Sequence, residues 1–74
     1  KQWIDIFFRI LKAGFSQPRK LLISNLSQNL KISKAQFEKI FQKLNFDLNA
    51  RAQDLSLENW EKLVLALKNS INRL

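Results

Sequence analysis

Apolar and polar side chains alternate with the period of an α-helix along most of the chain. In residues 34–44 the apolar positions follow the i, i+3, i+4, i+7 spacing that places side chains on one helix face. They are Phe37, Ile40, Phe41 and Leu44. Residues 2–13 are apolar over more than half of the helix circumference. We therefore expect this helix either to be central in a bundle or to be covered by a surface outside the chain.

A break between two amphipathic segments falls at residues 14–17. Gly14 is typical of the position just after a helix, where the backbone often turns left-handed. Pro18 fits the first turn of the next helix, because its φ is already helical and its missing N–H would have no partner there. These residues predict a helix over residues 18–30, with Ser16 or Gln17 as its N-cap.

Serine residues mark the starts of the last two predicted helices. Ser33 opens a capping-box pattern before the helix that ends near residue 44, and Ser56 precedes a helix over residues 57–74. The apolar stripe of that last helix comprises Leu57, Trp60, Leu63, Val64, Leu67, Ile71 and Leu74. Residues 45–55 form a connector in which Asn49 can cap a short turn. The pattern predicts an all-α fold: a small bundle of four main helices with a short extra turn before the last helix, in one domain over residues 1–74.

Positive charge is concentrated in one half of the chain. The net charge is +7, and residues 1–43 hold nine Lys and Arg against two acids. Residues 44–74 carry equal numbers of basic and acidic residues. A basic half of this kind is a candidate surface for a polyanion such as a nucleic acid. A surface that only keeps the protein in solution is the alternative.

Two cations stand beside the predicted start of the second helix. Helix starts attract anions through their free N–H groups and more often carry Asp or Glu, so Arg19 and Lys20 suggest a phosphate cradle. Lys20, Ser24 and Lys31 fall on the polar face of this helix, which has no acidic residue. Arg19 projects on the apolar side, where it can extend to solvent, pair with a carboxylate or reach across the helix end to a nucleic acid.

Several kinds of chemistry lack their residues. The chain has no His and no Cys, which removes the usual nucleophiles and metal ligands, and one Gly, which rules out a glycine-rich phosphate loop. We expect no catalytic, metal-binding or cofactor-binding residue in this chain. No apolar run approaches the roughly 20 residues of a membrane span. Because the chain also lacks Met, we interpret it as a domain excised from a longer protein.

Two blocks of sequence resemble one known family. The first is residues 13–26, AGFSQPRKLLISNL, and the second is residues 46–60, FDLNARAQDLSLENW. In this order and spacing they resemble the helical C-terminal domain of the KsgA (RsmA) type of ribosomal RNA small subunit adenine dimethyltransferases. The chain departs from the family pattern at Asn45, Leu48 and Gln53, where the family often has Gly, Pro and Glu. These departures leave the local turn geometry open.

The resemblance implies an RNA-processing role for the parent protein. Members of this family transfer methyl groups from S-adenosylmethionine to two adjacent adenosines in a hairpin near the end of small-subunit ribosomal RNA, during ribosome biogenesis. The cofactor site and catalytic residues belong to a Rossmann-like domain that is absent here, so the full-length protein is expected to be an enzyme and this chain alone is not. The helical domain helps to dock the enzyme on ribosomal RNA.

The resemblance also implies partners and a location. We expect contact with the RNA of the immature small ribosomal subunit and with the protein's own catalytic domain, and none with a membrane. We expect a monomer in the cytoplasm, with an organelle as the other option.

Six residues are candidates for RNA contact, and three for structural roles. The RNA candidates are Arg19 and Lys20 first, then Gln17, Lys12, Ser24 and Lys31. The structural candidates are Arg51, through a salt bridge or a bond to a carbonyl; Asn25, through a hydrogen bond; and Trp60, as a core anchor. The lysines of the third helix, Lys34, Lys39 and Lys43, are expected to form a solvated face.

Other functions fit parts of the pattern. The apolar face of residues 2–13 suits a structural or protein-interaction module that packs on the catalytic domain. Residues 18–44 also fit a helix-turn-helix DNA binder, although the third helix offers few side chains for reading bases. Membrane-surface binding by residues 2–13 is the weakest option, because the polar stripe contains Asp5 and few cations.

Overall fold

The computed structural model describes residues 2–70, and these form an all-α structure. Its helices are α1 (Gln2–Gly14), α2 (Leu22–Leu30), α3 (Lys34–Lys43) and α4 (Leu57–Ser70), with a short 3₁₀ helix, η1 (Ala52–Asp54), before α4. The fold class predicted from the sequence is therefore confirmed, including the short extra turn before the last helix.

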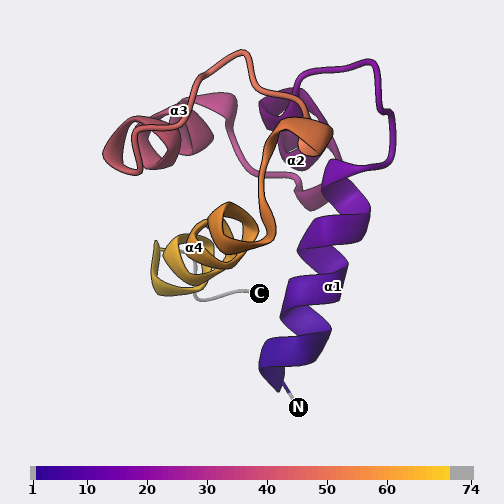
Figure 1. Cartoon of the computed structure of the whole chain (residues 1–74), viewed down its shortest axis with the longest axis vertical. Helices are drawn as coiled ribbons and strands as arrows, with labels where there is room; N and C mark the ends of the chain where they lie inside the picture. The colour runs from indigo at the N-terminus through magenta and orange to yellow at the C-terminus, as the bar shows by residue number, and fades with distance from the viewer. Residues whose placement is uncertain (1, 71–74) are drawn as a thin grey trace.

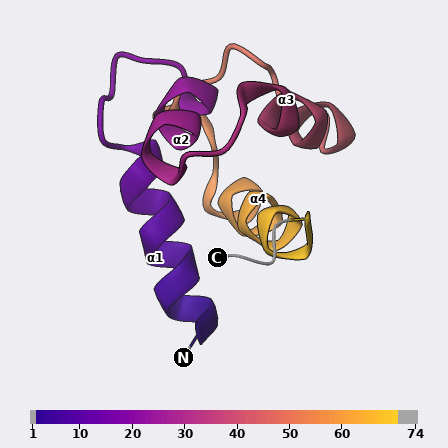
Figure 2. The same cartoon turned by 180° about the vertical axis from the view of Figure 1, so that it is seen from behind.

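The four helices surround one apolar core. α1 packs against α2 and α4, and α3 packs against the same two helices from the other side (Figure 1). The connector after α3 passes back beside α2 before it enters α4, as the reverse view also shows (Figure 2). The largest fully buried apolar side chains are Phe37, Phe41, Ile10, Leu22, Leu26, Leu63, Leu67 and Val64. Every helix contributes at least one of them, so the core joins all four.

The other described helices cover only part of the apolar surface of α1. Ile10 is fully buried in the core, and Ala13 is nearly so. In contrast, the side chains of Ile4 and Phe8 are 54% and 59% exposed. Of the two arrangements expected for this helix, the structure shows the peripheral one, in which one apolar side remains open.

The start of α2 differs from the prediction. The helix begins at Leu22 rather than at Pro18, and its N-cap position is Leu21, which makes no side-chain capping bond. Pro18 lies in a turn that is closed by a bond from Lys20 N–H to Gln17 C=O at 3.0 Å. Proline suits the second position of such a turn for the same reason that it suits a helix start, its fixed φ. The predicted cap by Ser16 or Gln17 and the helix over residues 18–21 are therefore wrong.

Gly14 ends α1, as predicted, but not through a left-handed backbone. It is the last residue of the helix, and its φ is not positive. A Cβ added there would lie 2.6 Å from Cη2 of Trp60 and 2.8 Å from Cδ1 of Leu22. The absence of a side chain is thus required by the close approach of α4 and α2 rather than by a turn.

The starts of α3 and α4 agree with the prediction. Ser33 Oγ accepts a bond from Gln36 N–H at 3.3 Å, and Ser56 Oγ accepts one from Asn59 N–H at 3.1 Å. One member of the predicted α4 stripe is misplaced, because Leu57 is 68% exposed. Two further members of that stripe, at positions 71 and 74, lie outside the described residues.

The connector turns without the predicted cap from Asn49. The N-cap position of η1 is Arg51, whose backbone N–H donates to Asp54 Oδ2 at 2.9 Å. Asn49 N–H donates to Asp47 Oδ1 at 2.8 Å, which forms the preceding turn. Asn45 has a φ of 61°, in the left-handed region that Gly and Asn tolerate best. The departure from Gly at this position therefore preserves the turn.

Candidate nucleic-acid interface

A basic groove opens beside α2. It has a volume of about 640 Å³ and lies between the loop of residues 15–21, the polar face of α2, the start of α3 and the connector. Its lining residues are Arg19, Lys20, Leu21, Ser24, Ser27, Gln28, Lys34 and Arg51. Four of these eight carry a positive charge, and none is acidic or aromatic. The basic groove therefore suits the backbone of a polyanion better than a base that must stack on a ring.

The loop of residues 15–21 is fixed by asparagines of α2. Asn25 Nδ2 donates to the carbonyl oxygens of Gly14 and Gln17, each at 2.9 Å, and Asn25 is 1% exposed. One turn further on, Asn29 Nδ2 donates to Ser16 Oγ at 2.9 Å. Loss of the Asn25 donor would leave the Gly14 carbonyl without a partner, which is costly. The loop that carries two cations is thus anchored to a helix of the core.

Arg51 ties the connector to the same loop. Its Nε donates to Arg19 C=O at 3.2 Å, across 32 positions of sequence. Leu22 N–H donates to Ala50 C=O at 2.9 Å, so the connector also occupies one of the free donors at the start of α2. The sequence suggested either a salt bridge or a bond to a carbonyl for Arg51, and the structure shows the bond to a carbonyl. The same residue also lines the basic groove.

The side of the groove formed by α2 is polar and uncharged. Ser24, Ser27 and Gln28 line it at i, i+3 and i+4 spacing, so they lie on one face of the helix. Ser27 Oγ donates to Ile32 C=O at 2.6 Å, and its oxygen keeps the capacity to accept. Hydroxyl and amide groups between cations are the groups that contact phosphate and sugar oxygens in nucleic-acid interfaces.

The structure brings together part of the predicted RNA-contact set. Arg19, Lys20 and Ser24 share the basic groove, whereas Gln17, Lys12 and Lys31 are not among its lining residues. Arg19 stands in the loop and not on a helix face, because α2 begins after it. Trp60, the predicted core anchor, is 3% exposed and stacks on Phe15 with 5.6 Å between ring centroids.

Sequence reasoning missed four polar or charged lining residues as contact candidates. They are Ser27, Gln28, Lys34 and Arg51. The first two carried a signal, because they share the polar face of the second predicted helix with Ser24. Lys34 carried only its membership of the basic half of the chain, and Arg51 was expected to have a structural role; their place in the groove depends on how the start of α3 and the connector pack beside α2.

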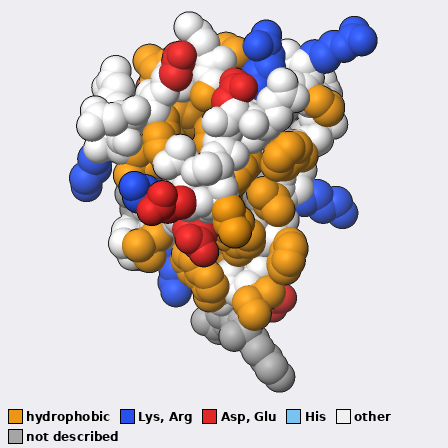
Figure 3. Space-filling model, viewed as in Figure 1, with side chains coloured by type: hydrophobic (Ala, Val, Ile, Leu, Met, Phe, Trp, Pro, Cys, Tyr) orange, Lys and Arg blue, Asp and Glu red, His pale blue; other side chains and the backbone are white. Residues whose placement is uncertain are grey.

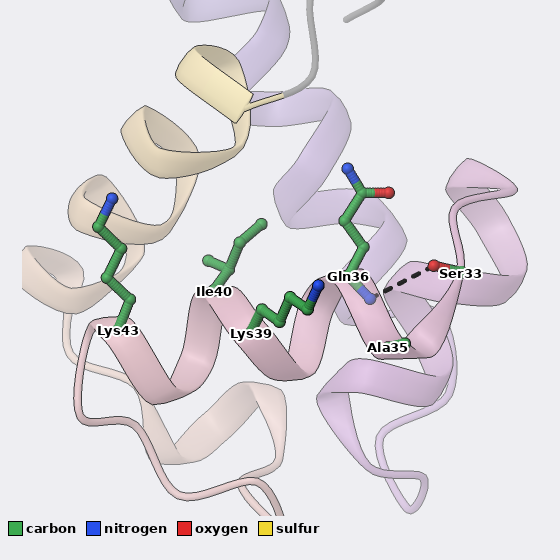
Figure 4. A pocket seen from close by; sticks show the side chains of 6 residues that line it. All are labelled: Ser33, Ala35, Gln36, Lys39, Ile40 and Lys43. Carbon is green, nitrogen blue, oxygen red and sulfur yellow. Dashed lines mark hydrogen bonds between the residues drawn. The ribbon is translucent and has the colours of Figure 1, made fainter.

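A second hollow of about 460 Å³ lies along α3 (Figure 4). It is lined by Ser33, Ala35, Gln36, Lys39, Ile40 and Lys43. The side chains of Gln36, Ile40 and Lys43 point to one side of the helix, and that of Lys39 extends along it, as Figure 4 shows. The three lysines of α3 that the sequence grouped into one solvated face are therefore divided between two hollows, with Lys34 alone in the basic groove.

The surface over α1 is apolar, in contrast to the basic groove. Hydrophobic side chains gather on the surface above this helix and toward α4 (Figure 3). A shallow apolar hollow between the two helices is lined by Trp3, Glu58, Glu61, Lys62 and Leu65. No helix within residues 2–70 is long and apolar enough to cross a membrane. The same residues contain no group of three or more acidic side chains that could hold a metal ion.

Comparison with known proteins gives one consistent answer. The chain is 41% identical over 59 residues to a protein named ribosomal RNA small subunit methyltransferase A from Dehalococcoides mccartyi, which covers 80% of this chain and 20% of the relative. Proteins of the same name from Acaryochloris marina and Bacillus pumilus are 37% and 34% identical, over 96% and 90% of the chain and 23% and 24% of the relatives. The chain belongs to the KsgA-type ribosomal RNA small subunit methyltransferase A family.

Within this family the chain corresponds to a C-terminal fragment. It spans about a fifth of the length of the methyltransferases that it matches. The residues that line the basic groove lie between positions 19 and 51. The match with the Acaryochloris marina protein covers 96% of this chain and therefore includes them. No family model matches the chain. No solved structure matches it either.

Proposed function

We propose that this chain is the ribosomal RNA docking domain of an S-adenosylmethionine-dependent adenine N6,N6-dimethyltransferase. The complete enzyme would modify two adjacent adenosines of small-subunit ribosomal RNA. It would act in the cytoplasm on the immature small subunit, during ribosome biogenesis. The cofactor and the catalytic residues would lie in the remaining four-fifths of the protein, because Gly14, the only glycine here, is packed against Trp60 and Leu22.

The observation that carries the proposal is the basic groove. Its four cations come from the loop, α3 and the connector, and its polar floor comes from α2. Cations on several rigid elements favour recognition of backbone and shape, as in structured RNA, over reading of bases by one helix. This arrangement supports RNA docking over the helix-turn-helix alternative, which needs base-reading side chains on a single recognition helix.

Neutralising Lys20 tests this function. The probe is a synthetic RNA hairpin that carries the two adjacent adenosines, and binding to the 74-residue chain is followed by fluorescence anisotropy over a series of salt concentrations. Loss of one phosphate contact lowers the slope of log K against log salt by about 0.7 to 1. We expect this change for Lys20→Gln, with binding weakened several-fold at low salt.

Lys62→Gln is the matched control, because it removes the same charge from α4, outside the basic groove. Equal effects of the two substitutions would mean that only net charge attracts the RNA. The proposed docking surface would then be wrong.

A second role is favoured by the open apolar side of α1. Ile4 and Phe8 lie one helical turn apart and are each more than half exposed. Since the chain spans about a fifth of its relatives, the rest of the enzyme is the natural cover for this side. We propose that α1 packs on the catalytic domain while the basic groove faces the RNA. The enzyme would remain a monomer in this arrangement.

A further inference from the structure

We propose that Lys34 is the far phosphate anchor of the basic groove, so that the groove takes a run of one RNA strand and not a single phosphate. The inference rests on the proposed RNA-docking function. It assigns a separate role to a lysine that the sequence places on a solvated face together with Lys39 and Lys43.

The turn between α2 and α3 holds Lys34 at a fixed place. Lys31 follows α2 as its C-cap residue, with a φ of 58° in the left-handed region. Ser27 and Ile32 then bond twice: Ile32 N–H donates to Ser27 C=O at 3.3 Å, and Ser27 Oγ donates to Ile32 C=O at 2.6 Å. Ser33 caps α3 immediately afterwards. The first residue of α3 is thus set rigidly beside the last turn of α2.

Cations consequently stand at both ends of the groove. Arg19, Lys20 and Arg51 lie at the N-terminal end of α2, and Lys34 lies beyond its C-terminal end. The α2 side of the groove runs from Leu21 to Gln28, which at about 1.5 Å per residue is about 10 Å. One phosphate group is too small to contact both ends. A strand with successive phosphates can do so, with its sugars over the serines between them.

The other lysines of α3 supply a matched control. Lys39 is exposed like Lys34 and stands on the same helix, but it lines the separate hollow that Figure 4 shows. Substitution of either residue removes one positive charge from an exposed position of α3. Any difference between the two variants in RNA binding must therefore come from the position of the charge.

The experiment compares Lys34→Gln, Lys39→Gln and Lys20→Gln with the unchanged chain. Binding of the same RNA hairpin is measured by anisotropy across a salt series, and circular dichroism checks that each variant is folded. We expect Lys34→Gln to weaken binding several-fold at low salt and to lower the salt slope by about 0.7 to 1, as Lys20→Gln does. We expect Lys39→Gln to change the slope by less than half as much.

The outcomes separate the inference from the function beneath it. Equal effects of Lys34→Gln and Lys39→Gln, together with a larger effect of Lys20→Gln, would overturn the role of Lys34 and leave RNA docking in place. No effect of Lys20→Gln, or no binding by the unchanged chain, would remove the docking function and this inference with it. A second readout is an NMR titration, in which the backbone amides of residues 33–36 must shift on addition of RNA.

Discussion

One buried amide determines where the cations of the basic groove stand. Asn25 is 1% exposed, and its two N–H groups are both used, one on the last carbonyl of α1 and one on the carbonyl of Gln17. The loop between α1 and α2 lacks the regular backbone hydrogen bonds of a helix, so these side-chain bonds hold it in place. The sequence indicated a hydrogen bond for this residue, but its two acceptors become visible only when α1 and α2 are packed.

Asn25→Ala removes both donors, which leaves the Gly14 carbonyl without its partner and the Gln17 carbonyl with only its bond from Lys20 N–H. We expect a loss of about 1 to 3 kcal/mol in the free energy of unfolding, because the Gly14 carbonyl becomes a buried acceptor without a partner. Urea unfolding followed by circular dichroism measures it. Gln28→Ala, at an exposed position of the same helix, should cost less than 0.5 kcal/mol. Equal costs for the two substitutions would show that the loop does not depend on the Asn25 amide.

At the scale of helices, the sequence predicted the starts that depend on local chemistry. Ser33 and Ser56 cap α3 and α4 as expected, because an N-cap bond joins residues only three positions apart. The start of α2 was wrong because Pro18 satisfies a turn and a helix start equally well, and the choice is made by distant contacts. One of these is the bond from Leu22 N–H to Ala50 C=O. The groove residues Lys34 and Arg51 escaped prediction for the same reason, since packing brings them together.

Alanine substitutions at the serines distinguish the observed caps from the predicted one. Ser33→Ala and Ser56→Ala should each lower the free energy of unfolding by about 1 kcal/mol, as is typical of a lost N-cap. Ser16→Ala should cost less than half as much, because Ser16 Oγ accepts only an exposed bond from Asn29 and does not cap α2. The measurement is denaturant unfolding of the three variants. If Ser16→Ala lowered the free energy of unfolding as much as the other two substitutions, the result would support the predicted helix over residues 18–30 with Ser16 as its N-cap.

At the scale of the molecule, charge and exposed apolar surface occupy different regions. The basic groove lies beside α2 and the loop that precedes it, whereas the open apolar side belongs to α1. Figure 3 shows the hydrophobic side chains above α1. In the proposed function, this separation would let the domain contact RNA at one region and the rest of the enzyme at another without competition between the two.

Phe8→Glu tests the apolar region in the 74-residue chain. An uncovered apolar side favours association between copies, so we expect the unchanged chain to self-associate at high concentration and Phe8→Glu to remain monomeric by sedimentation velocity. The melting temperature should change little, because Phe8 is 59% exposed. Arg9→Glu, on the neighbouring exposed position, is the control and should leave self-association in place. A chain that is monomeric at every concentration would remove the support for this region as a docking face.

The bond between Arg51 and the carbonyl of Arg19 has a consequence for protein synthesis. The two residues are 32 positions apart, so the groove closes only after the chain through the connector has been made. A nascent chain that ends earlier carries Arg19, Lys20 and Lys34 but not the wall that completes their arrangement. Under the proposed docking function, tight RNA binding would therefore require the chain through Arg51, and not only the segment that carries the other three cations.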